Sequence, residues 1–207
     1  MNELPEIIPV FPLSGAILLP TGNLPLNIFE PRYVDMLKHA RETNNLIGMI
    51  QKKENDEGLY SIGCVGKIDK HFKSDTNTYF INLHGLKKFT IVNEIKSNKR
   101  FRTFNVKYDE NEEAFNDISQ SNFNKKDFFE KLLTYSSRNN LNLDSESLEK
   151  INIKSLIIML AMACPFKNSE KQFLLESKNL DILIESLVSL LNFSNLQKFK
   201  DQHGQIN

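Results

Sequence analysis

The stretch that decides the fold is PVFPLSGAILLPTGNLPLNIFEPRY, residues 9–33. Its first four prolines interrupt apolar runs, and because proline cannot donate to a strand ladder, each marks the start, the edge or a bulge of a short strand. Thr21, Gly22 and Asn23 separate two of these runs with residues suited to a tight reversal, which predicts a hairpin-like turn. The stretch is therefore expected to form strand, turn and strand in succession.

The end of this stretch predicts the start of a helix. Pro31 suits the first helical position, where its missing N–H costs nothing, and an apolar stripe at helical spacing follows as far as Ala40. Glu30 lies at the positive end of that helix, and Arg32 is close enough in sequence to pair with it. We expect Glu30, Pro31, Arg32 and Tyr33 to fix a strand-to-helix corner rather than to bind a ligand.

Length and composition are typical of a globular protein that folds on its own. The chain has 207 residues, of which 40% are hydrophobic and 25% charged, and its length suits two modest domains in close contact. No apolar run approaches the length of about eighteen residues that a membrane span requires, and the acidic start at Glu3 is unlike a signal peptide. We therefore expect a cytoplasmic protein without a membrane segment.

Charge and cysteine content exclude further classes of protein. The formal net charge is zero, which argues against non-specific nucleic-acid binding by the whole chain. The halves differ, since residues 1–108 carry fifteen Lys and Arg against eleven Asp and Glu, or +4, and residues 109–207 carry eleven against fifteen, or −4. Cys64 and Cys164 have no second cysteine at metal-ligand spacing, so both are expected to be small buried hydrophobic residues.

Short strands continue after the opening stretch. Gly63 and Gly66 lie inside one of them, which indicates a bulge, a sharp bend or a close approach of two backbones. The segment Phe101–Tyr108 alternates strictly, so one of its faces is expected in the core and the other in water. With one helix inserted early, these strands favour a closed or nearly closed barrel. The expected strands are residues 46–50, 59–68, 79–85, 88–92 and 101–108.

The chain turns polar and acidic from Asp109, and helical spacing dominates after that segment. Pro165 ends one helix. Ser169 and Gln172 have the spacing of a capping box that starts another helix, and Asn179 is a candidate N-cap of the last one. The sequence thus predicts an α+β protein, with a barrel at residues 1–110, a polar linker at 111–124, an α-helical bundle at 125–193 and a polar tail at 194–207.

Several of these segments resemble one known family. The order Pro-x-Phe-Pro-Leu, Leu-Leu-Pro and Leu-Pro-Leu-x-Ile-Phe-Glu-Pro-Arg-Tyr within residues 9–33 is similar to the opening of the amino-terminal, substrate-binding domain of the Lon protease family. Residues 63–68, residues 83–89 and a Lys-Gln-x-Leu-Leu-Glu signature at 171–176 continue the resemblance, which covers roughly residues 7–193. The residues that depart from the usual family pattern are Thr21-Gly22, Asn27, Thr76-Asn77-Thr78 and Lys88.

The resemblance implies a PUA-like β-barrel followed by an α-helical bundle. It also implies a non-catalytic protein that binds exposed peptide segments or partner proteins, in a stand-alone form that lacks the ATPase and protease modules. The sequence contains no Gly-x-x-x-x-Gly-Lys-Ser/Thr phosphate loop and leaves no room for a Ser-Lys protease module. Ser169 and Lys171 are two residues apart on a predicted helix, which points them to different faces and disfavours a nucleophile and base pair.

No cofactor or metal ion is predicted. None of the four histidines is spaced with another His, Cys or acidic residue in a recognised ligand motif, so each is expected to be a satisfied or solvated side chain. These histidines are His39, His71, His84 and His203.

The least ordinary feature of the sequence is a basic group that we name as the candidate partner-binding site. It comprises Lys96, Lys99, Arg100 and Arg102, with Lys87 and Lys88 nearby in sequence. Such a run is usually a solvated loop; the alternative is a site for an acidic partner. RNA is one such partner, since PUA-like barrels in other proteins bind it, and the acidic half of this chain is another. The alternatives to peptide binding are therefore an RNA-binding PUA-like module and an assembly or adaptor subunit.

Overall fold

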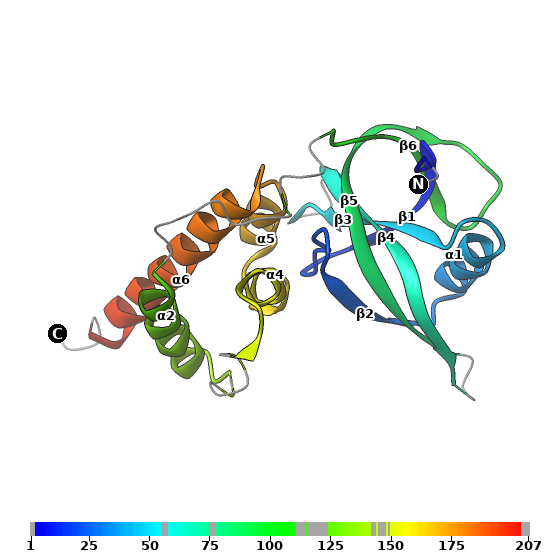
Figure 1. The fold of residues 1–207 in the computed structure, drawn as a ribbon. Helices are drawn as coiled ribbons and strands as arrows, with labels where there is room; N and C mark the ends of the chain where they lie inside the picture. Colours follow the sequence, from blue (N-terminus) through cyan, green and yellow to red (C-terminus); the bar gives the residue numbers. More distant parts are fainter. Residues whose placement is uncertain are drawn as a thin grey trace. The chain divides into compact units, whose positions relative to one another are not determined.

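The chain forms two compact units in the structure, which is a computed structural model (Figure 1). The first unit comprises Met1–Glu112 and Ile158–Glu176, and the second comprises Glu113–Ile157 and Ser177–Asn207. The structure describes residues 3–54, 58–74, 78–110, 115, 124–141, 144, 148 and 150–203, without the side chains of 197–203. Among these residues, no helix has both the length and the apolar character needed to cross a membrane.

The first unit is built on one mixed sheet of six strands (Figure 1). The strand order is β2-β5-β4-β3-β1-β6, and β5 also pairs with β6, so the sheet closes on itself. This closure confirms the predicted barrel, and it leaves β2 as an edge strand beside β5. The strands are β1 (Ile7–Leu13), β2 (Asn23–Ile28), β3 (Leu46–Lys52), β4 (Leu59–Lys73), β5 (Tyr79–Ile95) and β6 (Arg102–Tyr108).

The strand that closes the barrel is β5. It replaces two strands that the sequence predicts, at residues 79–85 and 88–92, because the irregularity between them is a β-bulge opposite Val65 and Gly66 of β4 rather than a turn. The first part of β5 pairs with β2 and the last part with β6, while β4 lies along most of its length. The predicted close approach at Gly63 is confirmed, since a Cβ there would lie 2.4 Å from the Met49 carbonyl oxygen.

The predicted turn at Thr21 forms, but the predicted hairpin is wrong. Thr21 has a φ of 64°, and its amide donates to the Gly85 carbonyl at 2.8 Å. β1 pairs with β3 and β6, whereas β2 pairs with β5, so the strands on either side of the turn are not neighbours. The intervening run at residues 18–20 is buried, irregular chain rather than a strand, because the turn after it bonds to β5.

Aliphatic and aromatic side chains fill the barrel, and the cluster at its centre includes Ile8, Val65, Phe89 and Phe104. Helix α1 (Pro31–Glu42) contacts β1 and β3, and its buried face carries the apolar stripe that the sequence predicts. Pro31 lies in the first turn of α1, as predicted. The corner between β2 and α1 is therefore set by the packing of α1 against the barrel.

Helix α5 (Asn168–Leu175) belongs to the first unit, and two glutamines tie it to the barrel. Gln51 donates from Nε2 to the Asn168 carbonyl at 3.0 Å and to Gln172 Oε1 at 3.2 Å. Gln172 in turn donates to the Ile62 carbonyl at 3.2 Å. α5 therefore covers part of β4, whereas the sequence assigns residues 158–176 to the helical bundle.

The predicted capping box at Ser169 and Gln172 is wrong by two residues. Lys167 is the N-cap of α5, and its amide donates to Glu170 Oε2 at 2.8 Å. Gln172 cannot serve the cap because its side chain is buried and bonded to β4. Ser169 is exposed, so its hydroxyl is not needed to satisfy the helix start.

In the second unit, α2 (Lys125–Arg138) packs against α6 (Leu180–His203). The Asn195 amide donates to the Lys131 carbonyl at 3.3 Å, and Arg138 donates to the Asn195 carbonyl. Asn179 caps α6 as predicted, since its Oδ1 accepts from the Ile182 amide at 2.8 Å.

The prediction of helices after residue 125 is confirmed. Helix α4 (Ile153–Ala163) contributes residues to both units and ends before Pro165, as predicted. α6 continues to His203, so the segment predicted as a polar tail begins as helix. The predicted linker at 111–124 lies outside the described residues except for Phe115 and Asn124.

Candidate functional site

The corner between β2 and α1 brings Glu30, Arg32 and Tyr33 together in the first unit. Arg32 donates from Nε and Nη2 to Glu30 Oε2 at 3.0 and 2.7 Å, so the predicted pair forms. The Arg32 guanidinium lies 4.6 Å from the centre of the Tyr33 ring, and that centre lies 4.2 Å from the centre of the Phe11 ring. The ring contacts connect the start of α1 to Phe11 of β1, and the ion pair lies exposed beside them.

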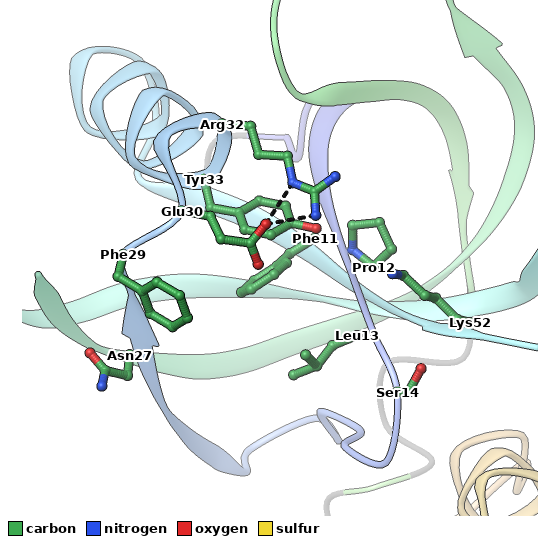
Figure 2. A pocket seen from close by; sticks show the side chains of 10 residues that line it. All are labelled: Phe11, Pro12, Leu13, Ser14, Asn27, Phe29, Glu30, Arg32, Tyr33 and Lys52. Carbon is green, nitrogen blue, oxygen red and sulfur yellow. Dashed lines mark hydrogen bonds and ion pairs between the residues drawn. The ribbon is translucent and has the colours of Figure 1, made fainter.

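A cavity of about 350 Å³ opens beside this corner (Figure 2). Its apolar wall includes Phe11 and Leu13 of β1, and Phe29 closes it on the side of β2. Phe29 is 66% exposed, which leaves a large aromatic side chain open to water at the rim of the cavity. The other lining residues are Pro12, Ser14, Asn27, Glu30, Arg32, Tyr33 and Lys52.

Two smaller cavities continue from the first one. A cavity of about 180 Å³ shares Pro12, Arg32, Tyr33 and Lys52 with it and is completed by residues 100–102. A third, of about 230 Å³, again includes residues 100–102 and extends along residues 94–97 and Lys99. Because neighbouring cavities share lining residues, we treat the three as one groove along the corner. We call it the corner groove; it runs from Phe29 to Lys96.

The cations of the corner groove are partly neutralised within the first unit. Arg102 donates from Nε and Nη2 to the two carboxylate oxygens of Glu94 at 2.7 and 2.6 Å, and this hydrogen-bonded pair lowers the pKa of Glu94. Arg100 lies 3.8 Å from an Asp35 oxygen in a contact exposed to water, which is worth little. The Lys52 ammonium forms no ion pair with a residue that the structure describes.

Tyr33, which lines the groove, and His39, which contacts the lining residue Lys99, have shifted pKa values. Burial raises the pKa of the Tyr33 hydroxyl, against the opposing effect of Arg32, so the hydroxyl stays protonated and can donate at neutral pH. Burial and the neighbouring Lys99 lower the pKa of His39, whose Nε2 lies 3.1 Å from the Lys99 ammonium. The neutral ring of His39 can therefore accept a hydrogen bond from Lys99.

The structure divides the basic group that the sequence names. Lys96, Lys99, Arg100 and Arg102 line the corner groove together. Lys87 and Lys88 lie on β5 opposite Val65 and Cys64, and neither lines any of the three cavities. Lys88 is only 7% exposed and its ammonium lies 3.8 Å from Asp109 Oδ2. Helix α5 covers this side of β4, and Gln172 of α5 donates a hydrogen bond to that strand. The sequence around Lys88 gives no sign of this contact.

Replacing Lys88 by Met is expected to leave the free energy of unfolding unchanged within about 1 kcal/mol, or to raise it, because Met fills the space without a buried charge. Burial lowers the pKa of Lys88, and Asp109 opposes that shift. Asp109→Asn should instead lower the free energy of unfolding by about 1–2 kcal/mol, since it removes the carboxylate beside the buried ammonium. Urea unfolding of both variants measures the difference. A larger loss in Lys88→Met than in Asp109→Asn contradicts this interpretation.

Most residues of the groove come from elsewhere in the chain than the predicted basic group, and three of them matter most for binding. Arg32 and Lys52 add two cations to it, and Phe29 adds the exposed aromatic rim. A sequence signal exists for Phe29, which directly precedes the Glu-Pro start of a helix and continues β2 beyond its last paired residue. No local signal marks Lys52, because its place depends on the pairing of β3 with β1.

The corner and the barrel match one protein family. The sequence model of the family described as the ATP-dependent protease La (LON) substrate-binding domain matches residues 7–192 of this chain. The chain belongs to this family. Its Lon-type segment thus contains all three cavities of the corner groove and α5.

Lon proteases are similar to this chain at low identity. The Lon protease of Desulfosudis oleivorans is 24% identical over 198 residues, which are 92% of this chain and 24% of that protein. Lon protease 2 of Myxococcus xanthus is 29% identical over 97 residues, which are 44% of this chain and 12% of that protein. The chain thus spans about a quarter or less of the length of these relatives.

Two solved structures have the same Lon-type fold. A Lon N-terminal domain protein from Xanthomonas campestris superposes with a TM-score of 0.60 at 18% identity, over 88% of this chain and 97% of that one. The N-terminal domain of the Mycobacterium avium complex Lon protease gives a TM-score of 0.59 at 12% identity, over 90% and 98% of the two chains. The predicted α+β fold class is confirmed by these neighbours.

Proposed function

We propose that the first unit binds exposed peptide segments of other proteins in the corner groove and carries out no catalytic step of its own. The observation that carries this proposal is the exposed ring of Phe29 at the rim of a cavity with an apolar wall that includes Phe11 and Leu13. Unfolded proteins expose apolar side chains, and burial of such a side chain against aromatic walls is favourable. Membership of a substrate-binding family supports the same role.

The groove also suits a chain rather than a compact ligand. Its three cavities follow one another along the corner, so an extended peptide could place successive side chains in them. Ser14, Asn27 and the Tyr33 hydroxyl supply polar groups to the first cavity, which can bond to a peptide backbone. These features support recognition of a peptide through apolar anchors and backbone hydrogen bonds.

Phe29→Ala is expected to weaken peptide binding about tenfold, because truncating an aromatic side chain that a bound peptide covers removes much of the binding energy. The measurement is a fluorescence-anisotropy titration of a labelled, uncharged, Phe-containing peptide with the full chain. Since Phe29 projects into water, its loss should change the free energy of unfolding by less than about 0.5 kcal/mol.

Phe173→Ala is the matched control. Phe173 is 56% exposed on α5 in the same unit and lines none of the three cavities, so its truncation should leave peptide affinity unchanged. Equal affinities for the wild type and Phe29→Ala, with a loss in Phe173→Ala, would place peptide binding outside the corner groove. No saturable binding of any peptide would refute the proposed function.

RNA binding is the second candidate, favoured by the cations that line the groove from Arg32 to Lys96. It is less well supported than peptide binding, because Arg32 and Arg102 already form ion pairs with Glu30 and Glu94. A cytoplasmic location fits either function, since Cys64 and Cys164 are free buried thiols.

A further inference from the structure

We propose that the corner groove selects peptide segments in which an apolar side chain lies two residues away from Asp or Glu. This preference rests on the proposed function, because it specifies which exposed segments the groove binds. It depends on the charges of the middle cavity, which lies between the apolar cavity and the basic end of the groove.

The middle cavity is lined by basic side chains, and the carboxylates that partly neutralise them lie outside its lining. Four of the residues that line it are basic, and none of its described lining residues is acidic. The basic residues are Arg32, Lys52, Arg100 and Arg102. The carboxylates that pair with the three arginines, on Glu30, Glu94 and Asp35, are not among its lining residues. An anionic side chain that enters this cavity therefore meets positive groups on several sides.

Hydrogen-bond donors remain available in the middle cavity. Arg32 and Arg102 each use Nε and Nη2 on their own carboxylate, so the Nη1 group of each makes no hydrogen bond to a described residue. Figure 2 shows the third guanidinium nitrogen of Arg32 pointing away from Glu30. The Lys52 ammonium is likewise unpaired among the described residues. A second carboxylate can accept from these donors through charge-assisted hydrogen bonds.

The position of the first cavity sets the spacing of the side chains. It shares Pro12, Arg32, Tyr33 and Lys52 with the middle cavity, so the two lie next to each other. In an extended peptide the chain rises about 3.3 Å per residue and residues two apart point to the same side, about 7 Å from each other. A residue two positions away from an apolar side chain that is bound beside Phe29 can therefore reach the middle cavity.

The walls favour a peptide over a nucleic acid. Single-stranded RNA binds strongly where open aromatic faces stack on successive bases. Tyr33 and the lining residues Phe11 and Phe101 are buried, so among the described aromatic residues of the groove Phe29 alone offers an open face, and successive bases would find no second one. A peptide with a carboxylate near an apolar side chain can bind the groove without any base stacking.

The test compares three labelled peptides that are identical except for one residue, with the sequence Phe-x-Glu, Phe-x-Gln or Phe-x-Lys between neutral spacers. Anisotropy titrations with the full chain should show the Glu peptide binding about fivefold tighter than the Gln peptide, and the Lys peptide weaker than both. The advantage of Glu over Gln should shrink as salt rises, because charge attraction at an open groove is screened.

Two double variants locate the preference. Lys52→Gln with Arg100→Gln should reduce the advantage of Glu over Gln to less than about twofold. Lys38→Gln with Lys67→Gln removes the same charge from exposed positions outside the groove and should leave the advantage unchanged.

Saturable binding with equal affinities for Glu and Gln overturns the preference but not the proposed function. Persistence of the preference in the groove variant, or tighter binding of an RNA oligonucleotide than of every peptide, also overturns it. If none of the peptides binds, both the preference and the proposed function fail.

Discussion

Gly85→Val is expected to destabilise the barrel by more than about 3 kcal/mol, enough to unfold much of a marginally stable protein. A Cβ at Gly85 would lie 2.0 Å from the Leu19 carbonyl oxygen and 2.9 Å from its carbonyl carbon. These are backbone atoms, so no side-chain rotation relieves the overlap. The amide of Gly85 also donates to the Gly22 carbonyl at 2.8 Å, which holds the two segments together. Urea unfolding followed by circular dichroism measures the loss.

Gly58→Ala is the control for this prediction. Gly58 has a φ of +93°, but a Cβ added there would meet no described heavy atom within 4 Å, so the substitution tests backbone conformation without steric overlap. We expect a loss of about 1–2 kcal/mol, which is the usual cost of placing a non-glycine residue at positive φ. A Gly85→Val variant as stable as Gly58→Ala would contradict the close approach of β5 to the turn at residues 19–22.

The response of binding to salt is the second large effect. An uncharged peptide held by apolar contacts and backbone hydrogen bonds should lose less than about twofold in affinity when salt rises threefold, because apolar contact is not screened. RNA held by Lys96, Lys99, Arg100 and Arg102 would follow a slope of about −3 in log affinity against log salt, or a loss near thirtyfold. We expect the first behaviour, with only weak binding of RNA.

Titrations of an uncharged peptide and a mixed-sequence RNA at two salt concentrations separate these cases. The Arg100→Ala, Arg102→Ala double variant should retain binding of the uncharged peptide. Tight RNA binding that is lost with salt and in the double variant, together with no peptide binding, would favour the RNA-binding alternative.

Local signals in the sequence predict much of the barrel. Proline placement, alternation and paired glycines identify most of its strands, and the spacing of Glu30, Pro31 and Arg32 predicts the corner before α1. These local signals do not predict which strands pair with one another. β1 lies between β3 and β6, and the barrel closes only because β5 is long enough to reach β6. The turn at Thr21 is correctly predicted, yet its hydrogen bonds with Gly85 carry the chain to β5 instead of forming a hairpin.

The candidate site was only partly predictable for the same reason. Lys96, Lys99, Arg100 and Arg102 are near in sequence, and the structure keeps them on one groove. Arg32 and Lys52 reach that groove through tertiary packing, which no short sequence pattern contains. Lys88 is buried because α5, far away in the chain, covers β4 near its cross-strand partner Cys64.

The measurement that tests peptide binding in the corner groove most directly is an NMR titration of the isotope-labelled full chain with an unlabelled, unstructured, Phe-containing peptide. Saturable shifts of backbone amides should concentrate at the non-proline residues that line the first two cavities, namely Phe11, Leu13, Ser14, Asn27, Phe29, Glu30, Arg32, Tyr33, Lys52 and residues 100–102. These shifts should be strongly reduced in Phe29→Ala and retained in Phe173→Ala. Saturable shifts confined to the second unit, or to the face of β4 that α5 covers, would contradict binding in the corner groove.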